Sequence, residues 1–131
     1  MRRLADFKDG TSSSIIVAEK ALAPQVWGTN GGDNEMWQNS GWDEDCIRYH
    51  FAPISDAQEA AYAGICNSPA KPFDSSTGTV WPNMFGGPHF GGVNVLLTDG
   101  SARMIKYSVD PGVFRMLSVI DDGGVLSADS F

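Results

Sequence analysis

Residues 93–107 read VNVLLTDGSARMIKY, and this stretch has the clearest local structural pattern in the sequence. Two apolar runs, 93–98 and 101–107, flank the dipeptide Asp99-Gly100. Asp-Gly between apolar runs predicts a β-hairpin with a two-residue type I′ turn, because glycine and aspartate tolerate the positive φ that this turn needs. The side chains of a strand alternate between its two faces, so one face of the hairpin collects apolar residues. We expect four of them in the core: Val95, Leu97, Ala102 and Met104.

A helix is expected directly after the hairpin. Asp110 is a good N-cap, and Pro111 suits the first helical position, where no N–H is needed. Apolar residues then recur at helical spacing up to about Val119. We expect three of them to pack on Val95, Leu97 and Met104: Phe114, Leu117 and Ile120.

The other predicted elements are short. Ser55 and Gln58 have capping-box spacing, which predicts a helix over 55–64. Strands are expected at 14–18, at 46–51, where Pro53 ends the run, and at 125–127, with loops over 21–45 and 67–92. This order of elements predicts an α+β fold with mainly antiparallel strands and one or two short helices.

The chain has 131 residues, which is typical of one domain, and we expect residues 1–131 to form a single domain. Its net charge of −7 argues against nucleic-acid binding, since phosphates need a positive surface. No apolar run is long enough to cross a membrane. Arg2 and Arg3 are not followed by an apolar stretch, so the residues alone predict no signal peptide.

The sequence contains no recognisable catalytic or cofactor motif, and we predict neither a catalytic residue nor a cofactor. His50 and His89 lack the spacing of metal ligands. Aromatic and acidic residues in the long loops form a possible ligand or partner surface. These residues are Trp27, Trp37, Trp42, Asp43, Asp45 and Trp81. Packing of the same tryptophans onto the sheet is the structural alternative.

Cys46 and Cys66 are predicted to form a disulfide bond. They are 20 positions apart, and closing a loop of that size stabilises a protein by about 3 kcal/mol in the entropy model. Two buried free thiols are the alternative if the chain is cytoplasmic.

His89 lies in the sequence GGPHFGG over residues 86–92. The glycines leave the backbone free, so we expect the imidazole to hold this loop by hydrogen bonds to main-chain carbonyls or to an Asp or Ser side chain. The predicted hairpin separates His89 from Asp99 by roughly 20 Å of strand, so the two are not expected to form a catalytic pair.

Several segments, taken in order, resemble a bacterial family. His89, nine residues and Asp99-Gly100 match the signature of the prepilin-type processing-associated His-x9-Asp-Gly family, a domain of unknown function. Further similar segments are 9–19, 41–45 with Ile47-Arg48, 107–114 and 124–131. His89, Asp99 and Gly100 carry over as signature residues, and the family supplies no catalytic role for them.

The resemblance implies a pseudopilin-like protein. Its members carry a prepilin leader, a long apolar helix and an exported β-rich head. We expect this chain to match the C-terminal part of such a head, without the leader and helix. The implied function is a non-enzymatic structural or interaction domain of a secretion or cell-surface assembly, with other pseudopilin-like subunits as partners. The alternative is a ligand-binding module for carbohydrate or Ca²⁺ in the tryptophan-rich and acidic loops.

Overall fold

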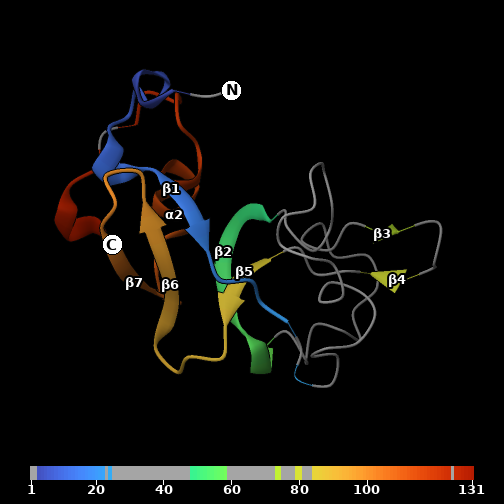
Figure 1. Ribbon diagram of the computed structural model, residues 1–131. Coiled ribbons are helices and arrows are strands. Elements are labelled where there is room, and N and C mark those ends of the chain that lie inside the picture. Colours follow the sequence, from blue (N-terminus) through green and yellow to red (C-terminus); the bar gives the residue numbers. More distant parts are fainter. Residues whose placement is uncertain are drawn as a thin grey trace.

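Figure 1 shows the computed structural model of the chain, in which residues 3–22, 24, 48–58, 73–74, 79–80, 84–124 and 126–131 are described. The expected hairpin is present as β6 (Gly92–Leu97) and β7 (Ala102–Lys106). The strand expected at 14–18 is β1 (Ile15–Ala18), which pairs antiparallel with β6. The three strands form one sheet in the order β1-β6-β7.

The turn between β6 and β7 has three residues, so the prediction of a two-residue turn was wrong. Gly100 N–H donates to the Leu97 carbonyl at 2.9 Å, and Leu97 N–H donates to the Ser101 carbonyl at 2.9 Å. Only the third turn residue, Gly100, is a glycine with positive φ, at +87°. A three-residue loop that ends on a left-handed glycine is the other common way to close a hairpin.

The longer turn shifts the register by one residue and reverses the side chains of β7. Leu96, and not Leu97, pairs with Ala102. Ala102 and Met104 are therefore exposed, which corrects their assignment to the core, while Ile105 is fully buried. A slip of one residue moves every side chain of a strand to the opposite face.

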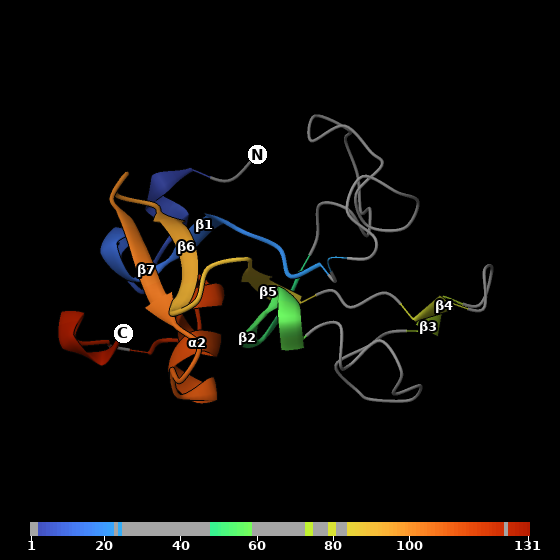
Figure 2. The ribbon, with the colours of Figure 1, turned by 90° about the horizontal axis from the view of Figure 1, so that it is seen from below.

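The core forms between the sheet and α2 (Pro111–Ser118), as expected. The sheet contributes Val93, Val95, Leu97 and Ile105, and α2 contributes Phe114 and Leu117. The rings of Phe114 and Phe85 also pack edge to face, with centroids 5.5 Å apart. Ile120 lies beyond the end of α2 and is only partly buried, so the expectation that it packs in the core with Met104 was wrong. Figures 1 and 2 show α2 on one face of the sheet.

The second sheet pairs β2 (Tyr49–Ser55) with β5 (Met84–Gly87) in parallel. Pro53 lies inside β2 and does not end it, which corrects the sequence prediction. The register shifts between Tyr49 and Ile54, so Pro53 falls where the ladder is irregular and its missing N–H costs little. A Cβ at Gly86 would overlap the main-chain oxygen of Ile54, so only glycine lets the two strands approach there.

The remaining elements are small. Residues 56–58 are helical, and the capping box is confirmed: Ser55 N–H donates to Gln58 Oε1 at 2.9 Å, and Gln58 N–H donates to Ser55 Oγ at 3.2 Å. β3 (Phe73–Asp74), β4 (Thr79–Val80) and β5 interrupt the stretch predicted as loop over 67–92. The 3-10 helices η1, η2 and η4 span Leu4–Asp6, Thr11–Ser13 and Ala128–Ser130.

The fold class agrees with the sequence prediction, since antiparallel strands and short helices make an α+β fold. Of the strand expected at 125–127, the two residues that the structure describes, Leu126 and Ser127, lie outside any strand and lead into η4. Among the helices in the described ranges, none has the length and apolar character needed to span a bilayer.

Candidate functional site

Glu19 lies directly after β1, at the point where the chain leaves one sheet for the other. Its N–H donates to the Asn94 carbonyl of β6 at 3.2 Å. Its own carbonyl accepts the Gly86 N–H of β5 at 3.1 Å. Lys20 then forms an antiparallel bridge with Phe85. The main chain at Glu19 therefore ties β6 to β5 and joins the two sheets.

The carboxylate of Glu19 collects three further contacts. Oε2 accepts the main-chain N–H of Asn94 at 2.8 Å, and Oε1 accepts the Asn94 side-chain amide at 3.3 Å. Oε1 also lies 2.9 Å from Nε2 of His89. Burial raises the pKa of Glu19, but the bonds from Asn94 and His89 outweigh it and hold the pKa below its ordinary value. The site therefore favours the charged carboxylate.

His89 lies in the loop between β5 and β6, with 47% of its side chain exposed. The expectation that its ring binds the chain is confirmed, but the partner is the Glu19 carboxylate and not a main-chain carbonyl or an Asp or Ser side chain. The contact becomes an ion pair whenever the ring is protonated. A half-exposed pair of this kind holds the loop to the end of β1.

Tyr107 completes the polar cluster at this junction. Its hydroxyl donates to the Gly87 carbonyl at 2.9 Å. Burial raises the pKa of Tyr107, and the nearby charges of Asp56 and Glu19 add to this, while the bond to Gly87 opposes it. The phenol therefore stays protonated and acts as a donor at neutral pH.

The other signature residues, Asp99 and Gly100, form the turn at the far end of β6. Asp99 Oδ1 accepts from the N–H and the hydroxyl of Ser101 at 2.8 and 2.7 Å, and these bonds hold the pKa of Asp99 low. Asp99 N–H donates to the Thr11 carbonyl at 2.9 Å. Thr98 donates to the Ser14 carbonyl from both its N–H and its hydroxyl, at 2.9 and 3.0 Å.

The signature therefore fixes β6 at both ends. At one end His89 and Asn94 bind Glu19, which follows β1, and at the other end the Thr98-Asp99 turn binds Thr11 and Ser14, which precede β1. His89 and Asp99 lie at opposite ends of β6 and have separate partners, as the predicted hairpin implies for their positions. The His89 ring and the main-chain N–H of Asp99 therefore tie β6 to the segments around β1, while the Asp99 carboxylate stabilises its own turn.

A family model described as a protein of unknown function, DUF1559, matches residues 1–112. This range holds Glu19 and every signature residue. The chain belongs to the DUF1559 family. Comparisons with curated proteins and with solved structures found no match.

Several predicted site residues of this DUF1559 protein lie outside the described ranges. They are Trp27, Trp37, Trp42, Asp43, Asp45, Trp81 and the two cysteines, Cys46 and Cys66. The ligand surface and the disulfide bond therefore stay predictions. Within the described ranges, no group of three or more His, Cys, Asp or Glu side chains is placed to hold a metal ion.

Sequence reasoning did not give Glu19 a role, although it ends one of the segments that carry the family resemblance. Its partners, His89 and Asn94, lie 70 and 75 positions away. A single acidic residue after a strand has no local pattern that points to such distant partners. The segment match was the signal that could have found it.

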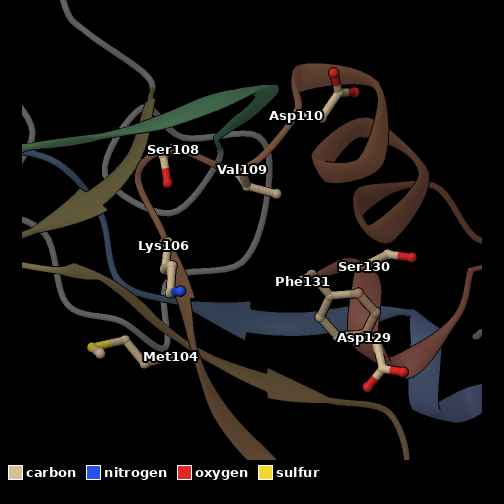
Figure 3. Close-up of a pocket in the computed structure, with 8 residues that line it drawn as sticks. All are labelled: Met104, Lys106, Ser108, Val109, Asp110, Asp129, Ser130 and Phe131. Atoms are coloured by element: carbon tan, nitrogen blue, oxygen red, sulfur yellow. The ribbon is translucent and has the colours of Figure 1, made fainter.

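A shallow pocket lies on another part of the DUF1559 domain. It has a volume of about 320 Å³ and lies between the end of β7 and the C-terminal residues. Figure 3 shows Lys106 on one side of it and Asp129 and Phe131 on the other. The remaining lining residues are Met104, Ser108, Val109, Asp110 and Ser130. Glu19, His89, Asn94 and Tyr107 are not among its lining residues.

Proposed function

We propose that this DUF1559 domain is a non-enzymatic interaction domain of an exported, pseudopilin-like assembly. The observation that carries the proposal is the exposed apolar face of the β1-β6-β7 sheet, opposite α2. We call it the open face. Its apolar residues are Val17, Leu96, Ala102 and Met104, of which Leu96 is half-buried, and Asn94 and Lys106 lie on the same face. A sheet face of this kind is a candidate surface for a protein partner.

The open face is continuous across the sheet. Val17 pairs with Leu96, and Leu96 pairs with Ala102, so the row crosses all three strands. Val17 is 60% exposed and Met104 is 56% exposed. Phe90, in the loop before β6, is fully exposed, and the Met104 methyl group lies near its neighbour Gly91. Burying these side chains against a partner would remove apolar area from water.

The signature residues support a structural role. The His89 ring binds Glu19 after β1, and the main-chain N–H of Asp99 binds Thr11 before β1. The Asp99 carboxylate binds Ser101 within the turn. The likeness to the prepilin-type family supplies the proposed partner class, which is other pilin-like subunits. The same likeness is the ground for proposing that the domain is exported.

Photocrosslinking in the cells that encode the chain tests this proposal. A photoreactive phenylalanine replaces Val17 on the open face, and the control replaces Arg115, which is exposed on α2. We expect the photoreactive residue at position 17 to crosslink to a protein whose encoded precursor has a prepilin leader. The one at position 115 should give no such product. Equal products at both positions, or partners without a prepilin leader, would contradict the proposal.

A further inference from the structure

Phe90 lies in the short loop that joins β5 to β6 (Figures 1 and 2), and its side chain is fully exposed. By contrast, Phe85 and Phe114 pack against each other at the core. A Cβ at Gly91 would lie 3.8 Å from the Met104 methyl group, so the residue after Phe90 lies against a side chain of the open face. Phe90 therefore lies at one end of this face.

The position of Phe90 depends on the side chain of the residue before it. Within the described ranges, the His89 ring is the only group of residues 88–90 that forms a hydrogen bond. That bond joins the ring to the carboxylate of Glu19 at 2.9 Å. On the other side of Phe90, the strand β6 begins only at Gly92. One side-chain contact therefore holds this loop between the two strands.

The acceptor of this contact is itself held by the sheets. The Glu19 carboxylate accepts two further bonds from Asn94, which is exposed on the open face. The main chain of Glu19 is bonded to both β6 and β5. The carboxylate is thus fixed relative to the open face, and through His89 it sets the position of Phe90 relative to that face.

We propose that Phe90 is an anchor residue of the open-face interface and that the contact between His89 and Glu19 positions it. The inference rests on the proposed function, since the partner is the pilin-like subunit that binds the open face. An aromatic side chain buries about 150–250 Å², and a ring that is fully exposed has this area free for a partner. A loop that is ordered before binding loses less conformational entropy when the partner binds. The partner surface is apolar over the sheet, with a hollow at one end that receives the ring.

The residues of this loop have different tasks. Phe90 contacts the partner, whereas His89 and Glu19 act through Phe90. Loss of the phenyl ring therefore weakens binding and leaves the loop ordered. Loss of the imidazole releases the loop, and it weakens binding only because Phe90 is no longer held.

The positioning is tested on the whole chain, without a partner, by the NMR order parameter S² of the Phe90 amide. His89→Ala removes the contact with Glu19. The matched control, Thr98→Val, removes one hydroxyl bond, to the Ser14 carbonyl at the opposite end of β6. We expect S² of about 0.85 in the unchanged chain and in Thr98→Val, and below about 0.6 in His89→Ala. Equal values in the unchanged chain and in His89→Ala would overturn the positioning role.

The anchor is tested by the crosslinking yield of the photoreactive residue at position 17. We expect Phe90→Ala to lower this yield about fivefold or more, because truncating an anchor costs more than about 1 kcal/mol. The matched control is Leu4→Ala, which removes an exposed apolar side chain on η1 and should change the yield less than about twofold. His89→Ala should lower the yield in the unchanged chain and cause no further loss when Phe90→Ala is already present.

The outcomes separate this inference from the proposed function. A product at position 17 whose yield does not fall in Phe90→Ala would overturn the anchor and leave the proposed function standing. A further loss from His89→Ala in the Phe90→Ala background would show that His89 does not act through Phe90. If the unchanged chain crosslinks at position 17 only to lipid or to a second copy of itself, the proposed function and the anchor both fail, whereas the order parameter of Phe90 still tests the positioning.

Discussion

Nε2 of His89 lies 2.9 Å from Oε1 of Glu19, a residue 70 positions earlier in the chain. The same carboxylate accepts two bonds from Asn94. One acidic side chain thereby connects the end of β1, the start of β6 and the loop before β6. The nine residues between His89 and Asp99 include the whole of β6. The histidine holds one end of this strand, and Asp99-Gly100 turns the chain at the other end.

Acid is expected to weaken this connection. The pKa of Glu19 lies below its ordinary value of 4.5, so the folded state favours the charged form. That stability is present above the ordinary value and is lost as the pH falls through the lower, folded pKa. We expect the unfolding free energy of Glu19→Gln to depend less on pH than that of the unchanged protein between about pH 5 and 3. Urea titrations at several pH values measure this. Asp121→Asn, which removes an exposed carboxylate elsewhere, should leave the dependence nearly unchanged.

The hairpin turn requires glycine at position 100. Its φ of +87° strains any residue with a Cβ, so Gly100→Ala is expected to lower the unfolding free energy by about 1–2 kcal/mol. Gly91→Ala is the matched control, because its new Cβ would lie 3.8 Å from the Met104 methyl group, an ordinary contact. Similar losses for the two variants in chemical denaturation would show that the turn is not constrained as described.

The capping of α2 is open to a direct test. Asp110 Oδ1 accepts the N–H groups of Gly112 and Val113 at 2.8 and 3.2 Å. Removing a cap of this kind costs about 1 kcal/mol, so Asp110→Ala should lower the melting temperature while Asp110→Asn retains most of the stability. Equal melting temperatures for the two variants would argue against the cap.

The core prediction concerns Phe114, which is fully buried. Phe114→Ala should cost about 3–5 kcal/mol of unfolding free energy, because it leaves a cavity beside Phe85 and the sheet. Its neighbour Arg115 is exposed, so Arg115→Ala should change that free energy by less than about 0.5 kcal/mol. A loss below about 1 kcal/mol for Phe114→Ala would contradict the packing of α2.

The elements that the sequence predicted correctly are those specified by residues close together in the chain. The Asp110-Pro111 start of α2, the capping box at Ser55 and the two strands of the hairpin are specified by neighbouring residues. The register was missed because Asp-Gly fits both a two-residue and a three-residue turn. In the structure the turn also binds Thr11 and Ser14, which are distant in sequence, and no local pattern indicates these bonds.

The site was predicted in part for the same reason. His89 was recognised as a residue that holds its loop, because the flanking glycines and proline need such support. Its partner was not, since Glu19 becomes its neighbour only after β1 pairs with β6. The parallel pairing of β2 and β5 was missed similarly, as no local pattern indicates which strand a short run will meet.

The claim that His89 and Glu19 together hold β6 against β1 is tested most directly by a double-mutant cycle on these two residues. The unfolding free energies of Glu19→Ala, His89→Ala and the double variant are measured at neutral pH. For a half-exposed pair we expect a coupling of about 0.5–1 kcal/mol. A parallel cycle on His89 and Asp99, which have separate partners, should be additive within about 0.3 kcal/mol. A Glu19–His89 cycle that is equally additive would contradict the account.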